Sequence, residues 1–324
     1  MSYLTKFRGA AAAALITTAL TSAAHADGAW PTQPSTLIVI AGAGGGSDYT
    51  MRLLARELEA HASAPISVVN QAQGAGVVGM TTYVNAKPDG TTVGQMSPFA
   101  QYRMMGQADF TSDSYTPIAL INMDPASVSV ATNSELGSLE AIVAKLKEDP
   151  ASLRISCGGG CNASWDIPFV AMLLDQGVDV SKLNLIPAQG SAAGLQELTS
   201  GGMDIVLCSL PETDALRDAG LVKNLAVFSA DRLERYPDVP TVEEATGTAA
   251  TGGTWRGIAG PAGMDGALVA TIEASIKQAY DSEGFQNGMK ERGFGAVWMD
   301  AEQLGAFMRE HEAQTERVIK ALNP

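Results

Sequence analysis

The stretch Thr36–Leu–Ile–Val–Ile40, followed by Ala41–Gly–Ala–Gly–Gly–Gly–Ser47–Asp48, decides how the rest of the chain is interpreted. The apolar run predicts a buried strand, and the apolar positions Met51, Leu53, Leu54 and Leu58 behind the loop predict an amphipathic helix. A glycine-rich turn from a strand into a helix exposes backbone N–H groups at the positive end of the helix. The segment therefore predicts an anion-binding loop, with Asp48 as the N-cap of the helix.

The same order of strand, loop and helix recurs along the chain, which predicts an α/β fold with mainly parallel sheets. At least four loops that directly follow predicted strands are rich in Gly, Ser, Asn or Gln, two in the first third and two in the middle third. Ligands of open α/β sheets bind at the carboxyl ends of the strands. The distribution of these loops therefore predicts a ligand cleft between two lobes.

Residues 1–26 have the three parts of a secretory signal. Lys6 and Arg8 form the positive region, residues 9–20 form the apolar core, and Ala24–His25–Ala26 is a small-x-small cleavage site. No cysteine follows the apolar core, and no later run reaches the roughly 18–20 apolar residues of a membrane span. We expect cleavage near Ala26 and export of the mature protein to the periplasm.

The chain is acidic, with a formal net charge of −14, and removal of Lys6 and Arg8 with the signal would make it two units more negative. Such a surface disfavours nucleic acid and anionic membranes as partners. An anion would have to be held by local donors, and backbone amides suit this task because they add no net charge. Arg256, beside Trp255, is interpreted either as a cationic clamp or as an arginine whose stem covers aromatic surface.

The chain has three cysteines, Cys157, Cys161 and Cys208, and in an oxidising compartment an odd number leaves at least one thiol unpaired. Cys157 and Cys161 enclose three glycines and could pair with each other, but pairing of either with Cys208 fits the sequence equally well. A zinc site is not expected, because the mature chain has only His61 and His311 and neither has ligand spacing. We expect neither a metal nor a cofactor.

Templates for catalysis fit the chain poorly. Gly190–Ser191–Ala–Ala–Gly194 lacks the spacing of G-x-S-x-G, and the two histidines lie in polar helical stretches that we expect to be exposed. Gly74-x-Gly76-x-x-Gly79 matches the dinucleotide fingerprint, but the acidic residue required further on is missing, because Asp89 belongs to a turn and not to a strand end. We therefore do not expect an enzyme.

Short motifs follow one another over essentially the whole mature chain. They are Trp30–Pro31 with Pro34, Leu37–Ile–Val39 with Ala43–Gly–Gly–Gly–Ser–Asp48, Val68–Val–Asn70 with Gly74–Ala–Gly76, Lys87–Pro–Asp–Gly90, Gly190–Ser191 with Leu195 and Leu198, Asp204–Ile205, Pro237–Asp–Val–Pro–Thr–Val–Glu–Glu–Ala245, and Trp255-x-Gly257 with Ala259-x-Pro261. In this order and spacing they resemble the Bug family, the extracytoplasmic solute receptors of tripartite tricarboxylate transporters.

The resemblance implies a bilobal periplasmic binding fold (type II-like) that closes around a small organic mono- or dicarboxylate and delivers it to the membrane subunits of a transporter. It also implies that neutral donors and helix ends hold the anion, rather than an arginine clamp. The expected ligand residues, from the resemblance and from the loops behind the strands, are Gly44, Gly45, Gly46, Ser47, Asp48, Gln71, Gly74, Ala75, Gly76, Ser97, Ser156, Cys157, Gly158, Gly160, Asn162, Ser164, Gln189, Gly190, Ser191, Cys208 and Ser209.

The chain departs from the family in its middle third. Many relatives have a Gly/Ser/Thr loop followed by His where this chain has Cys157–Gly–Gly–Gly–Cys161, and relatives often have Asp or Asn at the position of Cys208. The substrate therefore does not follow from the resemblance. Asp166 is interpreted as a first-turn helix charge or, if it faces the cleft, as a partner for a hydroxyl or amine of the ligand.

We expect lobe one to comprise residues 27–125 and 250–324, and lobe two residues 126–249. The hinge is expected near Asn122–Pro125 and between Ser229 and Gly253. The protein is expected to be a monomer. Three alternatives stay open: a secreted hydrolase or oxidoreductase that uses the same cleft, a carboxylate sensor without a transport role, and a redox or metal chaperone built on Cys157 and Cys161.

Overall fold

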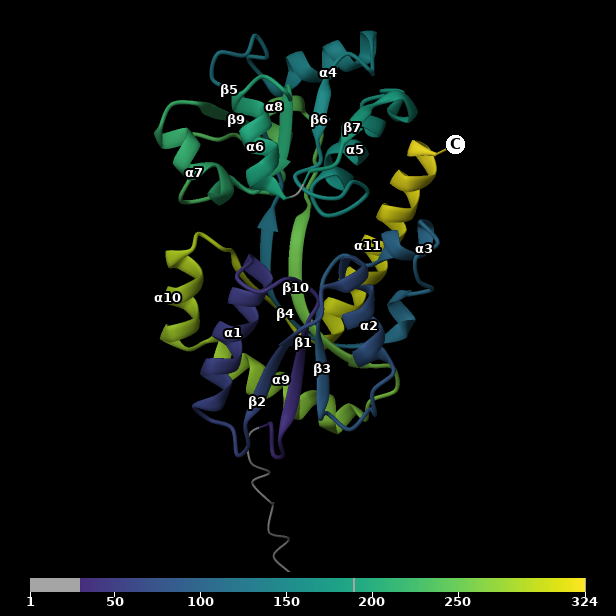
Figure 1. The fold of residues 1–324 in the computed structure, drawn as a ribbon, viewed down its shortest axis with the longest axis vertical. Coiled ribbons are helices and arrows are strands. Elements are labelled where there is room, and N and C mark those ends of the chain that lie inside the picture. The colour runs from purple at the N-terminus through teal and green to yellow at the C-terminus, as the bar shows by residue number, and fades with distance from the viewer. Residues whose placement is uncertain (1–29, 189, 324) are drawn as a thin grey trace, which may run out of the picture.

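The computed structural model describes residues 30–188 and 190–323, so the predicted signal at 1–26 lies outside the described residues. The chain forms two α/β lobes that are stacked along the long axis of the molecule (Figure 1). The predicted bilobal fold is confirmed. Within the described ranges, no helix is both long enough and apolar enough to cross a membrane.

The first lobe is built on a six-stranded sheet with the order β11-β4-β10-β3-β1-β2. Helices α1, α9 and α10 cover one face of this sheet, and α2, α3 and the first half of α11 cover the other. Each face has its own apolar cluster between the sheet and its helices. The strands are β1 (Ser35–Val39), β2 (Ile66–Asn70), β3 (Thr92–Met96), β4 (Tyr115–Pro125), β10 (Gly253–Pro261) and β11 (Ala296–Met299). The helices are α1 (Gly46–Glu59), α2 (Val77–Val84), α3 (Ala100–Met104), α9 (Gly266–Tyr280), α10 (Glu283–Glu291) and α11 (Ala301–Leu322), with short 3-10 turns η1 (Gln73–Gly76) and η2 (Ser112–Ser114).

The second lobe has a five-stranded sheet with the order β7-β6-β8-β5-β9. Its larger apolar cluster joins the sheet to α4, α5 and α8, and a smaller one lies under α6 and α7. The strands are β5 (Ser127–Ala131), β6 (Arg154–Ser156), β7 (Asn184–Ile186), β8 (Ile205–Cys208) and β9 (Val222–Val227). The helices are α4 (Leu139–Glu148), α5 (Asp166–Asp175), α6 (Ser191–Thr199), α7 (Leu210–Asp218) and α8 (Val242–Thr246), with the 3-10 turn η3 (Val180–Lys182).

Both sheets are mixed, so the prediction of mainly parallel sheets is wrong. Strand β1 runs parallel to β2 and β3, and β6 runs parallel to β7 and β8. Strands β4, β10 and β11 pair antiparallel, as β5 does with β8 and β9. The antiparallel strands are those beside the passages between the lobes, and their direction depends on where the chain re-enters a sheet, which local hydrophobic patterns do not encode.

The chain passes between the lobes where β4 continues into β5 and where β10 begins. Ala126 donates its N–H to the carbonyl of Gly252 (2.9 Å), Gly252 donates to Phe228 (3.0 Å), and Phe228 donates to Ala126 (2.8 Å). At Gly253, φ is +155° and a Cβ would collide with the carbonyl of Asp124, so only glycine fits. The crossings lie directly behind the predicted segment 122–125 and at the end of the predicted stretch 229–253.

Helix α11 forms a third link between the lobes. Leu304 and Met308 belong to an apolar cluster of the first lobe, whereas Val318 and Ile319 belong to the large cluster of the second. In Figure 1 the yellow helix rises from the first sheet to the side of α5. Arg317 adds an ion pair with Asp175, the last residue of α5 (2.8 Å).

Candidate functional site

The loop between β1 and α1 is held by a carboxylate behind it. Gly45 is the N-cap of α1, and Asp48 lies in the first helical turn, so the prediction of Asp48 as the N-cap is wrong. The Asp48 carboxylate accepts hydrogen bonds from the Gly44 N–H (2.9 Å), Asn70 Nδ2 (2.9 Å) and Arg52 Nε (2.8 Å). Burial raises the pKa of Asp48, but these hydrogen bonds outweigh it and leave the pKa below its ordinary value.

A polar cluster lies under the same loop. Ser47 Oγ accepts hydrogen bonds from Gln95 Nε2 (2.9 Å) and Arg256 Nε (3.0 Å). Arg256 also binds Asn122 and pairs with Asp124 Oδ2 (2.8 Å), both near the end of β4. Arg256 is only 9% exposed, and its guanidinium lies over Phe294. The interpretation of an arginine over aromatic surface is thus confirmed, with Phe294 as the ring, but the guanidinium is buried in an ion pair and does not reach out to solvent.

Sequence reasoning did not find this cluster. Its members come from α1, β3, β4 and β10, and the bond between Ser47 and Arg256 spans 209 residues. One signal was present, because Arg256 stands inside the strand pattern Thr254–Ala259, where a charge needs a buried partner.

The other predicted residues of the first lobe lie around this loop with different exposure. Gly44, Gly45, Gly74 and Ala75 are exposed, Gly46, Ser47, Gln71 and Ser97 are half-buried, and Asp48 and Gly76 are buried.

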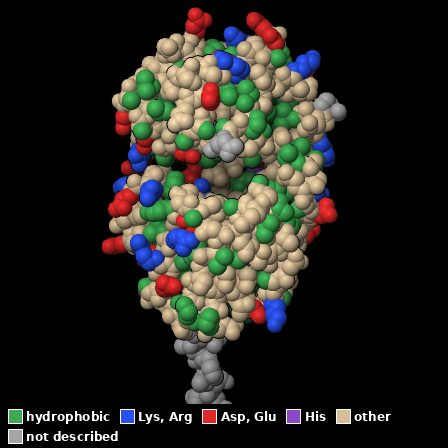
Figure 2. Space-filling view, viewed as in Figure 1, with side chains coloured by type: hydrophobic (Ala, Val, Ile, Leu, Met, Phe, Trp, Pro, Cys, Tyr) green, Lys and Arg blue, Asp and Glu red, His purple; other side chains and the backbone are tan. Residues whose placement is uncertain are grey.

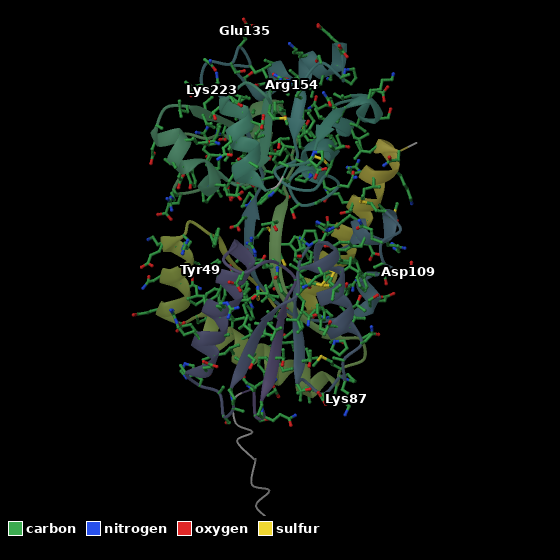
Figure 3. The ribbon with its side chains drawn as sticks, viewed as in Figure 1. Tyr49, Lys87, Asp109, Glu135, Arg154 and Lys223 are labelled. Carbon is green, nitrogen blue, oxygen red and sulfur yellow. A yellow bond between two sulfur atoms is a disulfide. The ribbon has the colours of Figure 1, made fainter. Side chains whose placement is uncertain are left out.

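Tyr49, which Figure 3 labels on α1, donates its hydroxyl to the Gly288 carbonyl and thereby fixes α1 against α10 (2.9 Å). The α1 N-terminus is thus anchored on two sides.

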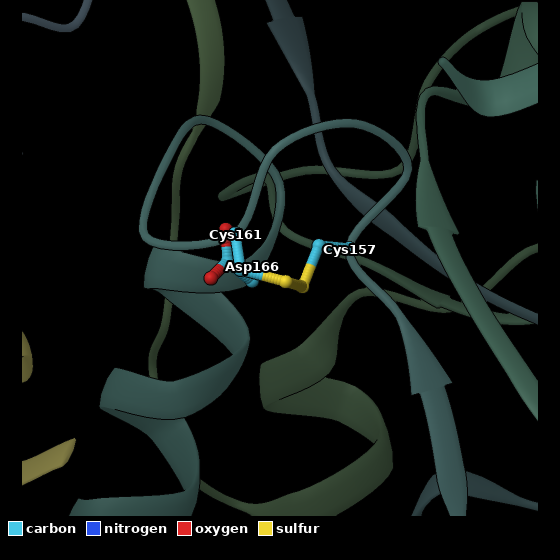
Figure 4. A group of neighbouring side chains, drawn as sticks. All are labelled: Cys157, Cys161 and Asp166. Carbon is cyan, nitrogen blue, oxygen red and sulfur yellow. A yellow bond between two sulfur atoms is a disulfide. The ribbon is translucent and has the colours of Figure 1, made fainter. Parts of the chain in front are cut away.

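The loop behind β6 is closed by a disulfide between Cys157 and Cys161, which decides between the pairings that the sequence left open (Figure 4). Backbone hydrogen bonds attach the ring to its surroundings, from Cys157 to Ile186 (3.0 Å) and from Ala188 to Gly159 (2.8 Å). Ser191, the first residue of α6, donates its hydroxyl to the Gly158 carbonyl (3.1 Å). The ring, β7 and the start of α6 therefore form one unit.

Asp166 begins α5 and turns back onto this ring. Its side chain is fully buried and accepts the N–H groups of Asn162 (2.6 Å) and Ala163 (2.9 Å). Burial raises the pKa of Asp166 to about 6, against the lowering effect of these hydrogen bonds. The first-turn interpretation of Asp166 is confirmed, and its buried carboxylate binds the backbone of the loop that precedes α5.

Cys157, Cys161 and Asp166 also form a cluster of potential metal ligands, the only such group of three or more within the described ranges. A thiolate is needed for metal binding, and both sulfurs are committed to the disulfide. While the disulfide is formed, the cluster offers a metal ion only one ligand group, the carboxylate of Asp166.

The remaining predicted residues of the second lobe differ in accessibility. Gly160 is exposed, Asn162, Ser164 and Gly190 are half-buried, and Ser156, Cys157, Gly158, Ser191, Cys208 and Ser209 are buried. Gln189 lies outside the described residues. Ser209 is the N-cap of α7 and is bound to Glu212 Oε2 through both its N–H and its hydroxyl (2.9 Å each).

Among the predicted ligand residues, Cys208 has a thiol that lies inside an apolar cluster and not at a surface. Cys208 is fully buried in an apolar cluster with Leu195, Leu198 and Val206, and burial raises the pKa of its thiol well above the ordinary value. A thiol in such surroundings is unreactive. It belongs to the core of the second lobe and not to a ligand site.

The two loops lie at the same passage between the lobes. A Cβ on Gly252 would approach Pro168 in the first turn of α5 (2.8 Å), and Asp124, beside Gly253, holds Arg256 and through it Ser47. The N-termini of α1 and α5 therefore flank the crossing strands. Figure 2 shows the surface hollowed at this height, between the two halves of the molecule.

A separate groove of about 330 Å³ lies beside α1. Its lining comes from the first lobe alone: Gly44, Asp48, Tyr49, Arg52, Leu53, Arg56 and Arg292. It is therefore not the space between the lobes.

The two histidines of the mature chain differ in environment. His61 is exposed, as expected, but His311 is half-buried between Trp255 and Phe307, so the expectation of exposure is wrong for His311. Burial lowers the pKa of His311 to about 4, which keeps the ring neutral near neutral pH. It packs as an aromatic side chain.

The chain is similar to proteins of one family over most of its length. The model of the "tripartite tricarboxylate transporter family receptor" matches residues 50–323. A UPF0065 protein of Bordetella pertussis is 28% identical over 84% of each chain. The protein BugT of the same organism is 24% identical over 90% of each chain.

Solved structures give the same result for the fold. A TctC solute-binding protein from Polaromonas has a TM-score of 0.77 at 28% identity and covers 90% of this chain and 99% of its own. MatC of Rhodopseudomonas palustris with bound malate has a TM-score of 0.72 at 22% identity, and an R. palustris protein with adipate has 0.73 at 23%. Each of these two covers 90% of this chain, and they cover 100% and 98% of their own chains. The resemblance to Bug proteins is confirmed, and the chain belongs to the family of tripartite tricarboxylate transporter receptors.

Proposed function

We propose that this protein is a periplasmic receptor that closes two lobes, residues 27–125 with 250–324 and residues 126–249, around a small organic mono- or dicarboxylate. It then delivers the ligand to the membrane subunits of a tripartite tricarboxylate transporter. The signal at 1–26 directs its export, and it acts as a monomer. Membership in the receptor family supports the transport role, and the malate and adipate bound to two structural neighbours support the ligand class.

The observation that carries the proposal is the pair of helix N-termini at the passage between the lobes. Loop 44–48 leads into α1 on one side, and loop 157–165 leads into α5 on the other. Helix N-termini and free backbone N–H groups attract anions without adding net charge, which suits a chain with a formal net charge of −14. A carboxylate between the lobes would bind donors from both and favour the closed form.

The ligand set that we propose is smaller than the one expected from sequence. It keeps the glycine and serine residues of loop 44–48, and Gly160, Asn162, Ser164 and Gly190 in the second lobe. It omits Cys208, whose thiol lies in the core, and treats Asp48 and Asp166 as residues that shape the loops.

We further propose that the protein binds its ligand without catalysis. Ser47 is bonded to Gln95 and Arg256, neither of which is a general base at neutral pH. His311 packs against Trp255 and Phe307, and its bond to Thr315 stays within α11. Within residues 30–188 and 190–323, no serine or cysteine hydrogen-bonds to a histidine as a nucleophile would.

A thermal-shift screen tests the ligand class. The full chain, exported and purified from the periplasm, is screened against malate, adipate and other small mono- and dicarboxylates, with a neutral sugar and a divalent metal as comparison ligands. At about 100 times Kd, a ligand stabilises the native state by about 2.7 kcal/mol, which raises Tm by several degrees. One or a few carboxylates should do so. The proposal is wrong if no carboxylate raises Tm.

A further inference from the structure

Arg256 has more hydrogen-bond donors than its protein surroundings use. A guanidinium carries five N–H groups. Nε donates to Ser47, and Nη1 donates to Asn122 and Asp124, so three of the five are taken. Nη2 has no partner among residues 30–188 and 190–323, although Arg256 is 9% exposed. Nη2 is not fully enclosed by the protein, so it can donate to a partner from outside the chain.

The free nitrogen lies beside the loop of the first lobe. A Cβ on Gly46 would be 3.0 Å from Arg256 Nη2 and 3.1 Å from the ring of Phe294. The backbone of Gly46 is an ordinary first turn of α1, so its conformation does not require glycine. The missing side chain instead leaves room for the guanidinium next to the helix N-terminus.

The same arginine fixes the direction of the Ser47 hydroxyl. A hydroxyl has two acceptor lone pairs and one donor. Both lone pairs of Ser47 Oγ are occupied, by Gln95 Nε2 (2.9 Å) and Arg256 Nε (3.0 Å). The hydrogen is therefore left to donate, and it meets no acceptor within the described part of the chain. Ser47 and Nη2 of Arg256 thus present free donors side by side.

We propose that Arg256 is a specificity-determining residue. Its Nη2 and the hydroxyl of Ser47, which Arg256 orients, together bind one carboxylate of the ligand. This inference rests on the proposed function and deepens it, because the first-lobe half of the site would bind its anion with a charged donor. Charge-assisted hydrogen bonds are about twice as strong as neutral ones. Asp124 pairs with the guanidinium at 2.8 Å, so the buried charge of Arg256 is balanced within the protein.

The test compares the wild type with the double variant Arg256→Gln, Asp124→Asn, which removes both charges of the pair together. The probe is malate, adipate or whichever member of the carboxylate panel raises the wild-type Tm most, together with its fully amidated analogue. Titration calorimetry should show carboxylate binding weakened at least about tenfold. The ratio of the two Kd values, amide over carboxylate, should fall by a similar factor, because only the second lobe still prefers an anion.

Arg56→Gln is the control for loss of a positive charge, since it removes one from an exposed site on α1, the helix that begins at Gly46. It should leave the affinity unchanged. Arg256→Lys is the variant to use if the double variant does not fold. It keeps the charge but cannot reach all the acceptors, so it should also weaken carboxylate binding. The inference is overturned if a folded double variant, or Arg256→Lys, binds the carboxylate within about twofold of the wild type. Weaker binding of both ligands with an unchanged ratio also overturns it, because Arg256 would then be only structural. A wild type that binds no carboxylate refutes the proposed function itself.

Discussion

The Ala41–Asp48 loop and the Cys157–Asp166 loop both lead from a strand into a helix, and they are held by opposite means. The second is held locally, by a disulfide across four positions and by Asp166, which binds residues three and four positions earlier. The first is held mainly from a distance, by Arg256, Gln95 and Asn70. The second-lobe loop therefore has a covalent link and a carboxylate of its own in addition to its bonds to β7 and α6, whereas the first-lobe loop depends mainly on the assembled sheet.

This difference predicts how far the structural effect of a substitution in each loop would extend. A change in the disulfide ring should stay within the second lobe, because the ring's bonds go to its own segment, to β7, to Ala188 and to the start of α6. A change in the Arg256 cluster should affect the hinge as well, because Asn122 and Asp124 lie on β4 just before the chain crosses between the lobes.

The largest effect is expected from Asp124→Ala. The variant leaves the Arg256 guanidinium buried without its anion, and breaking a buried pair in this way costs about 3–5 kcal/mol of unfolding free energy. Urea denaturation followed by circular dichroism measures the loss. Asp179→Ala, which removes an exposed ion pair with Lys182, is the control and should leave the midpoint unchanged. A loss below about 1 kcal/mol for Asp124→Ala would show that the pair does not hold the first-lobe half together.

A smaller effect is expected from Gly158→Ala in the disulfide ring. Gly158 has φ +64°, and a Cβ would collide with the carbonyl of Leu207 on β8, so the ring would have to move away from the sheet. Strain and overpacking together should cost about 3 kcal/mol. Gly159→Ala is the matched control in the same ring, because no atom lies within 4 Å of its Cβ position. If the two variants unfold at the same urea concentration, the ring is not seated on β8 as described.

The local parts of the fold could be predicted from the sequence, and the distant contacts could not. The apolar run 36–40 and the helical spacing behind Asp48 predicted β1 and α1 because both patterns repeat within a few residues. The N-cap of α4 is equally local, because Ser138 accepts the N–H of Ala141, three residues later. The antiparallel strands were missed because pairing direction depends on the path of the chain between the lobes.

The same limit applies to the candidate site. The glycine loops were visible in the sequence, but the N-cap of α1 was placed three positions too late, at Asp48, because nothing local shows that Gly45 caps the helix. The inward direction of Cys208 depends on which face of β8 meets α6. Arg256 meets Ser47 only after strands separated by more than 150 residues have paired, and no spacing rule covers such a distance.

The smallest of the three effects is a pH dependence that belongs to the second-lobe loop alone. Burial raises the folded-state pKa of Asp166 from 3.8 to about 6, so the folded protein binds a proton that the unfolded chain has already released. Stability from this group is therefore complete below the unfolded pKa and is lost as the pH rises towards about 6. Between about pH 4.5 and about pH 7, the wild type should lose about 2 kcal/mol relative to Asp166→Asn, which cannot titrate. Urea denaturation of both proteins across this range measures the difference. A difference that does not vary with pH would show that the carboxylate is solvated, and that the disulfide and backbone bonds alone hold the loop. A decline in this window would instead establish that the Asp166 carboxylate, which accepts hydrogen bonds from Asn162 and Ala163 of the same loop, titrates with a raised pKa in the folded protein.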